Sequence, residues 1–500
     1  MKRRTLLRGM LGATGFPAVL RGLKRPADEK PNLLFLWTDQ QRADTMAVYG
    51  NHRFHVPAMN RLASTSIVFE KCYVTQPICT PSRSSVMTGL WPHTNGCITN
   101  NIPLRSGAKT FPELLADPAY RTGYFGKWHL GDEVFAQHGF EEWVSVEDLY
   151  FKYFTKGRDR SRRSSYDRFL RKLGYEPDDK KNDRFSRVEA VRKPLAHCKP
   201  VFLAMRATDF ILRHRNEAWI LYVNFLEPHP PFYGRLNDLH NPSEAPLPPN
   251  YPGIPIEGEP TRYQKIREKK KKTGVGNPAY LVLEGHAMKN PADFQRLSRN
   301  YAGLCSQVDQ AIARILWTLE ASGQADNTIV VYTSDHGEMM GAHSLVGKAV
   351  MYEEAVRVPL LLRVPFAHSR QIVVEQPVSN VDIVPTLLEL MGKRPPEFLQ
   401  GRSLLPLVNG TARGGEPVFI EWHTPPDGPN GRAVVTVDGW KLALYDTDNC
   451  LLFDRTRDPL EMHNLYYRSE YAQVRRELRR QIEAWQARTS DVVALPSEDS

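Results

Sequence analysis

Apolar runs that end in polar clusters recur along the chain and predict a layered α/β fold. Such runs are typical of buried parallel strands, because a strand covered on both faces is apolar nearly throughout. They occupy residues 32–37, 67–74, 219–226, 328–333 and 358–362. Segments with helical spacing of apolar residues lie between them, as at 57–66 and 291–322. This alternation predicts a large, mostly parallel mixed sheet flanked by helices.

The C-terminal part of the chain has a different pattern. Short apolar runs at hairpin spacing predict antiparallel strands, and a helical pattern follows them. These segments are 418–422, 432–437, 441–445, 450–454 and the helix 471–488. We therefore expect an α/β domain over residues 31–400, a smaller α+β subdomain over 401–490 and a tail over 491–500. Residues 250–287, rich in Pro, Gly and Lys, are expected to form a loop, and 395–415 a linker.

The charge of the chain favours a polyanionic partner. The formal net charge is +10, and basic residues gather in two segments, 151–200 and 262–272, the second of which contains Lys269 to Lys272. Residues 151–200 hold 16 Lys and Arg against 7 Asp and Glu. Two interpretations stay open: a rim of loops that attracts a polyanion, or a solvated insertion. The basic residues are not interleaved with aromatic ones, so we expect no nucleic-acid partner.

The first 30 residues are a candidate targeting segment. Lys2-Arg3-Arg4-Thr5-Leu6-Leu7-Arg8 is similar to a bacterial twin-arginine export signal, and a short, weakly apolar run follows it. That run is too short to span a bilayer, and no other stretch reaches the required length. The segment predicts export to the periplasm or the exterior, with the cleavage point open.

One of the six cysteines stands in a distinctive motif. Residues 79–89 read Cys79-Thr80-Pro81-Ser82-Arg83 and continue to Thr88-Gly89, and no Cys-x-x-Cys pair indicates a zinc ribbon or a redox dithiol. The motif resembles the sulfatase signature, in which the cysteine is oxidised after synthesis to the aldehyde formylglycine. A thiol that attacked a sulfate ester would form an adduct with no easy route of release. A hydrated aldehyde avoids this, because one hydroxyl attacks sulfur and the other then collapses to the carbonyl and expels sulfate.

Other polar residues follow the predicted strands directly. Asp39 and Gln40 come after the first strand, His229 after the run at 219–226, and Asp335 and His336 after the run at 328–333. Ligand sites of open α/β sheets lie at the carboxyl ends of the strands. Carboxylate and amide oxygens there suit a hard divalent cation.

Two further motifs contain lysine. Lys127 and His129 lie in a stretch expected to be extended, in which residues two apart point to the same side. The second motif ends in Lys348, in the segment Gly341-Ala342-His343-Ser344-Leu345-Val346-Gly347-Lys348.

Taken together, these motifs resemble those of the type I, formylglycine-dependent sulfatases, an arylsulfatase-like family of the alkaline phosphatase superfamily. The resemblance covers residues from about 31 to 488. It implies the alkaline-phosphatase-like fold and conversion of Cys79 to formylglycine by a maturation enzyme. It also implies a Ca²⁺ ion, favoured over Mg²⁺, held by Asp39, Gln40, Cys79, Asp335 and His336.

The resemblance further assigns roles to the basic residues. Arg83, Lys127 and Lys348 would stabilise charge that develops on oxygens in the transition state. His229, or Lys348 in its place, would protonate the leaving alcohol. His129 would remove the proton whose loss expels sulfate.

The expected function is hydrolysis of sulfate esters, with a sulfated polysaccharide or its oligosaccharides as substrate. Two alternatives stay open. The same site could hydrolyse phosphonate or phosphate esters, since tetrahedral oxyanions differ mainly in charge. The chain could also be a sulfated-glycan-binding protein without catalysis.

Overall fold

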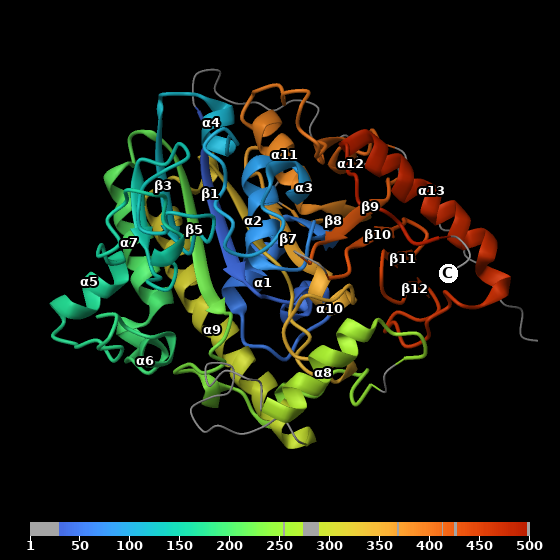
Figure 1. The fold of residues 1–500 in the computed structure, drawn as a ribbon. Coiled ribbons are helices and arrows are strands. Elements are labelled where there is room, and N and C mark those ends of the chain that lie inside the picture. Colours follow the sequence, from blue (N-terminus) through green and yellow to red (C-terminus); the bar gives the residue numbers. More distant parts are fainter. Residues whose placement is uncertain are drawn as a thin grey trace, which may run out of the picture.

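An eight-stranded sheet runs through the centre of the molecule (Figure 1). The computed structural model describes residues 30–253, 256–273, 290–367, 370–412, 414–424 and 428–497, so the predicted export segment lies outside the described residues. The strand order is β4-β3-β5-β1-β6-β7-β2-β8. Only β7 runs antiparallel to its neighbours in this sheet, which confirms the predicted mixed, mostly parallel arrangement.

Five of the eight strands of this sheet lie close to the predicted apolar runs, whereas β3, β4 and β8 were not among those runs. Their bounds are β1 (Asn32–Asp39), β2 (Ile67–Tyr73), β3 (Tyr120–Gly126), β4 (Glu142–Ser145), β5 (Ala218–Pro228), β6 (Thr328–Ser334), β7 (Arg357–Arg363) and β8 (Ile372–Ser379). All eight residues of β1 are buried, because neighbouring strands cover both its edges and helices cover both its faces.

The described helices pack on both faces of the sheet, apart from α13, which packs on the C-terminal sheet. They are α1 (Pro57–Ser64), α2 (Cys79–Thr88), α3 (Pro92–Asn95), α4 (Phe111–Leu115), α5 (Ser165–Lys172), α6 (Arg187–Val191), α7 (Lys199–Arg213), α8 (Thr261–Thr273), α9 (Pro291–Ala321), α10 (Glu353–Val356), α11 (Ile383–Leu390), α12 (Leu405–Val408) and α13 (Ala472–Thr489). None of the described helices combines the length and apolar character needed to cross a bilayer.

The alternation of side chains along β1 divides the core into two layers. Leu33, Phe35 and Trp37 pack with residues of α2, α4 and α11. Leu34 and Leu36 point to the other face and pack with residues of α1, α7 and α9. The sheet is therefore held between two helical layers, and its strand ends are left for polar side chains.

The C-terminal subdomain is a four-stranded antiparallel sheet with a helix on its outer face. Its strands, in the order β12-β11-β10-β9, are β9 (Val418–Trp422), β10 (Gly431–Val435), β11 (Trp440–Tyr445) and β12 (Leu451–Asp454). Alternate residues such as Phe419 and Leu442 pack against α13, and the opposite face joins the main core through Ile420 and Ala443. In Figure 1 the red helix α13 lies along the outer side of this sheet.

One predicted loop is wrong: within residues 250–287, the segment Thr261–Thr273 forms the helix α8. The helix begins where the Asp448 carboxylate accepts from the backbone N–H groups of Thr261 and Arg262, at 2.8 and 3.1 Å. An acceptor anion at this end satisfies donors that the helix itself leaves unpaired. Because Asp448 is distant in sequence, the local composition of the segment gave no sign of this cap.

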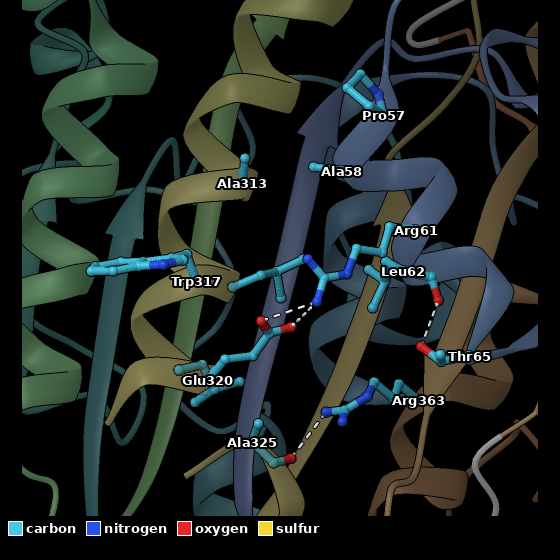
Figure 2. Close-up of a pocket in the computed structure, with 12 residues that line it drawn as sticks. Pro57, Ala58, Arg61, Leu62, Thr65, Ala313, Trp317, Glu320, Ala325 and Arg363 are labelled. Atoms are coloured by element: carbon cyan, nitrogen blue, oxygen red, sulfur yellow. Dashed lines mark hydrogen bonds and ion pairs between the residues drawn. The ribbon is translucent and has the colours of Figure 1, made fainter. Parts of the chain in front are cut away.

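A surface groove of about 480 Å³ lies between α1 and α9 (Figure 2). Trp317, 67% exposed, lies at one wall, and the Arg61–Glu320 ion pair, at 3.0 Å, crosses it. No residue predicted to carry chemistry lines this groove. This groove is thus separate from the residues singled out by the sequence.

Candidate active site

The carboxyl ends of three neighbouring parallel strands bring the predicted acidic and histidine residues together. Strand β1 lies between β5 and β6, so Asp39 at its end lies near the residues that follow those two strands. His229 comes directly after β5, and Asp335 and His336 come directly after β6. The topology therefore builds the site from segments far apart in the sequence.

Cys79 is the first residue of α2. Its Sγ atom lies 3.2 Å from His336 Nε2 and 3.2 Å from Lys348 Nζ. The side chain is buried at the positive end of the helix dipole. Burial and Asp39 raise the pKa of the thiol, but Lys127 and Lys348 outweigh them and lower it to about 7. The six cysteines, all described, are free of disulfides.

The two carboxylates are oriented by one arginine. The Arg83 guanidinium donates from Nη2 to Asp39 Oδ2 at 2.9 Å and from Nε to Asp335 Oδ2 at 2.7 Å. All three side chains are fully buried. The Oδ2 atom of each carboxylate therefore accepts a hydrogen bond from Arg83. The Oδ1 atoms lie toward His336 Nε2, at 3.8 Å for Asp39 and 3.5 Å for Asp335.

His336 completes a set of four ligand atoms. Its Nδ1–H donates to the carbonyl oxygen of Gly337 at 3.0 Å, so the Nε2 atom is the one available to a metal. Ligand atoms of Asp39, Cys79, Asp335 and His336 all lie within 4.8 Å of one another. Two oriented carboxylates and an imidazole nitrogen fit a divalent cation, which confirms a candidate metal site here.

Gln40 lies beside this set, and its amide is fixed on both sides. Its Nε2 donates to Glu338, and its Oε1 accepts from Lys348 Nζ at 2.6 Å. The backbone N–H of Gln40 donates to Asp335 Oδ1 at 2.9 Å. Its predicted role as a metal ligand stays a prediction, and the structure adds that its amide oxygen binds Lys348.

Lys127 reaches the same centre from the end of β3. Its Nζ donates to Asp39 Oδ2 at 2.6 Å, and both side chains are fully buried. Burial raises the pKa of Asp39, but Lys127 and the other cations nearby hold it well below its usual value. Asp39 is thus an anion whose charge is balanced by Lys127 and Arg83.

His129 does not lie in an extended stretch. The prediction that an extended backbone directs the side chains of Lys127 and His129 to the same side was therefore wrong. Strand β3 ends at Gly126, and His129 has a φ of 58°, held by its N–H donating to Glu133 Oε2 at 2.7 Å. Its Nε2–H donates to Asn101 Oδ1 at 3.0 Å, whereas the buried Nδ1 has no partner among the described residues. Burial, followed by Lys127, keeps its pKa well below the usual value, so the imidazole is neutral and can accept a proton.

His229 is directed by the prolines around it. Its Nδ1–H donates to the carbonyl oxygen of Pro230 at 2.8 Å, and its side chain is nearly buried. Burial, then Lys348, keeps its pKa well below the usual value. The neutral ring therefore holds its proton on Nδ1.

Sequence reasoning assigned no role to two buried residues that support the site. Glu338 holds the Gln40 amide, as above, and Asn224 Oδ1 accepts from Arg83 Nη2 at 3.4 Å. A signal existed for each: Asn224 is a polar residue inside an apolar run, and Glu338 lies three residues after Asp335.

Comparison with known proteins identifies the family. Residues 31–393 match the sulfatase family model, and residues 341–488 match the model of the N-sulphoglucosamine sulphohydrolase C-terminal region. The chain is 30% identical over 466 residues to the uncharacterized sulfatase YidJ of Escherichia coli, covering 90% of this chain and 86% of that protein.

Two further similarities concern a characterised glycan sulfatase and a solved structure. The chain is 27% identical to the N-acetylglucosamine-6-O-sulfatase of Bacteroides thetaiotaomicron, covering 93% of this chain and 87% of that protein. It is 26% identical to BT4656, solved with D-glucosamine 2-N,6-O-disulfate, with a TM-score of 0.73 and coverage of 93% and 99%. The chain belongs to the sulfatase family of the alkaline phosphatase superfamily and is a hydrolase of sulfate esters.

Proposed function

We propose that this sulfatase removes sulfate from a sulfated polysaccharide or its oligosaccharides, using formylglycine made from Cys79 and a bound Ca²⁺. The observation that carries the chemistry is the set of ligand atoms from Asp39, Cys79, Asp335 and His336 around one point. The similarity to an N-acetylglucosamine-6-O-sulfatase supports a saccharide substrate.

The metal would be held by the four residues of that set, with Gln40 as the predicted fifth ligand. A divalent cation held by these residues would supply positive charge that makes the nucleophile's hydroxyl more acidic and offsets the charge of the sulfate oxygens. The carboxylates favour Ca²⁺, with Mg²⁺ as the weaker alternative because it demands tighter octahedral geometry. Arg83 fixes both carboxylates before any ligand arrives, so binding requires little rearrangement.

The basic residues around Cys79 have two separate roles, stabilisation of negative charge and removal of a proton. Lys127 and Lys348 place fixed positive charge near the nucleophile, where the oxygens of the sulfate group gain charge. His129, with its unprotonated Nδ1, takes the proton whose loss from the aldehyde hydrate expels sulfate and restores the carbonyl.

The leaving alcohol needs a proton from either His229 or Lys348. Neutral His229 carries its proton on Nδ1, where the Pro230 carbonyl holds it. Its Nε2 must therefore acquire a proton before it can act as the acid. Lys348 Nζ already acts as a donor beside the nucleophile, to Gln40 Oε1 at 2.6 Å and to Cys79 Sγ at 3.2 Å, which favours Lys348 as the proton donor.

The proposal is tested by measuring sulfate release from defined sulfated disaccharides and an aryl sulfate, and alcohol release from a phosphate diester, using protein co-expressed with a maturation enzyme. We expect the highest kcat/KM for a sulfated saccharide. A higher kcat/KM for the phosphate diester would instead identify a phosphate or phosphonate ester hydrolase. Release from the aryl ester alone would contradict the saccharide assignment.

We also propose export through the twin-arginine-like segment. Export of a folded protein suits an enzyme whose cysteine is oxidised before it leaves the cytoplasm. Replacing Arg3 and Arg4 by lysine should keep the protein in the cytoplasmic fraction, and unchanged secretion would contradict the proposal.

A further inference from the structure

Tyr150 covers the catalytic histidine. The rings of His129 and Tyr150 stack with centroids 4.3 Å apart and planes 30° from parallel. Tyr150 Oη in turn accepts from Arg187 Nη2 at 2.9 Å. A direct chain of contacts therefore links the site to Arg187, the first residue of the short helix α6. The sequence placed Arg187 in the basic segment 151–200 but singled out neither residue.

Arg187 is held in place by a buried acid. Its Nε donates to Glu147 Oε2 at 2.7 Å, and Lys199 also binds Glu147. Two cations thus share one carboxylate, which leaves an excess positive charge. Glu147 and Lys199 are 1% and 6% exposed at the side chain, whereas Arg187 is 15% exposed. Arg187 is therefore the member of the three most accessible to a ligand.

One edge of the Arg187 guanidinium has no protein partner. Its Nε and Nη2 atoms bind Glu147 and Tyr150, but its Nη1 makes no hydrogen bond to any residue that the structure describes. A guanidinium can bind oxyanions along more than one edge, and a second anion with two oxygens matches its planar fork. The contacts with Glu147 and Tyr150 thus orient the group without using all of its donors.

The positive charge of Arg187 acts on both histidines of the proposed site, His129 and His229. Burial is the main cause of the low pKa of His129 and of His229, and Arg187 adds to the lowering of both. Asp39 is among the groups that raise the pKa of Arg187, although burial acts against it. The guanidinium therefore lies within electrostatic range of the nucleophile's surroundings.

Other basic residues of the 151–200 segment differ from Arg187. Several of them form an ion pair with an acidic residue of the same segment. These pairs are Arg171 with Asp167 at 2.5 Å, Arg184 with Asp179 at 2.8 Å and Lys193 with Glu189 at 2.6 Å. These pairs stabilise the segment itself. Arg187 instead connects the segment to the catalytic pocket through Tyr150.

We propose that Arg187, held by Glu147 and Tyr150, binds a second anionic group of the substrate. This inference rests on the proposed saccharide sulfatase function and narrows it to substrates that carry a second sulfate or a carboxylate near the ester that is cleaved. A sulfate on the same sugar and a uronate on the neighbouring sugar present the same oxyanion chemistry. Arg187 is then a specificity-determining residue rather than a catalytic one.

The test measures binding in a Cys79→Ala background, which keeps the pocket but cannot turn over substrate. Calorimetry compares D-glucosamine 6-O-sulfate, D-glucosamine 2-N,6-O-disulfate and a monosulfated disaccharide with a uronate. We expect one of the two dianions to bind at least about tenfold more tightly than the monosulfate, because a charged hydrogen bond is worth about 1.5–3 kcal/mol. The preferred dianion identifies whether sulfate or carboxylate is bound.

Substitutions then assign this preference to Arg187. Arg187→Gln should reduce the preference to about twofold or less, and Tyr150→Phe, which keeps the ring but removes the hydroxyl, should reduce it partly. The matched control is Arg192→Gln, which removes the same charge from an exposed residue at the other end of α6 and should leave the preference unchanged. Thermal melting of each variant verifies that it is folded.

Two outcomes would overturn the proposal: no preference for either dianion, or an equal loss of affinity for all three ligands in the Arg187→Gln variant. The second outcome would mean that Arg187 only supports the position of His129. Because these measurements need no turnover, they are independent of the sulfate-release assay. Failure of the wild-type protein to release sulfate would contradict the proposed function, not the dianion preference.

Discussion

Two buried clusters of charge in this molecule have different organisation. In the first, Arg83 binds one oxygen of Asp39 and one oxygen of Asp335, and Lys127 also binds Asp39. The remaining ligand atoms lie around one point. In the second, here called the balanced cluster, two acids and two bases bind one another. Its members are Glu353, Lys441, Arg455 and Glu461.

The balanced cluster joins the main domain to the C-terminal subdomain. Lys441 Nζ lies 2.7 Å from Glu461 and 3.3 Å from Glu353, and Arg455 Nη2 lies 2.7 Å from Glu353. Both clusters are largely buried, so burial of charge alone does not indicate catalysis. The difference lies in ligand atoms that face a common point beside a potential nucleophile.

The largest expected effect is on chemistry at Cys79. Cys79→Ala should lower the rate of sulfate release by on the order of 10⁶-fold, as loss of a covalent nucleophile does elsewhere. The melting temperature should hardly change, since alanine fits the space. Release of sulfate measured by ion chromatography tests this, and activity within tenfold of wild type would contradict it.

The balanced cluster should respond in the opposite way. Lys441→Ala leaves Glu461 and Glu353 buried with fewer partners, which should lower the free energy of unfolding by about 3–5 kcal/mol. Denaturant unfolding measures this loss. The turnover number per folded molecule should stay near that of wild type, and a large drop in it would show that the cluster contributes to catalysis.

Lys127→Ala should reduce kcat by about 10²–10³-fold, the usual cost of removing one donor that stabilises transition-state charge. Arg83 still pairs with Asp39 in this variant, so the fold should persist. Steady-state kinetics with folded protein tests the prediction. An effect confined to KM would mean that Lys127 binds substrate and transition state equally.

The smallest effect concerns His93, which joins α3 to β9 and α13. Its Nδ1 lies 2.7 Å from Glu421, and its Nε2 lies 3.2 Å from the Thr489 carbonyl oxygen. Burial lowers the pKa of His93, but Glu421 and Asp491 raise it above its usual value. The stabilisation of the fold by protonated His93 is therefore complete below the pKa of this histidine in the unfolded chain. It is lost as the pH rises through the pKa of His93 in the folded protein.

His93→Gln should accordingly lower the unfolding free energy more at about pH 6 than at about pH 9, on either side of a histidine pKa. Denaturant titrations at both values measure the difference. A destabilisation that is equal at both would show that the His93 charge contributes nothing.

Local patterns predicted five of the eight strands of the main sheet and the polar residues at the ends of three of them. Asp39 and Asp335 could be placed together because each follows an apolar run and parallel strands end at the same edge. The relative position of Lys127 and His129 could not, because it depends on a positive φ that Glu133 stabilises. The helix α8 was missed because Asp448 caps it from a distant part of the chain.

Tyr150 and Arg187 show a second limit of the sequence. Each lies in a segment without clear periodicity, and its importance comes only from contacts with His129 and Glu147. The four ligand atoms that lie together could be predicted from the strand ends and the cysteine motif, whereas the contacts of Tyr150 and Arg187 depend on long-range packing.

The most direct test of the central claim is peptide mass analysis of residue 79, made on the same sample that is assayed for sulfate release. The account predicts that, after co-expression with a maturation enzyme, active protein has lost the sulfur of Cys79 and carries an aldehyde that reacts with a hydrazide. Sulfate release by protein whose residue 79 is entirely cysteine would contradict it.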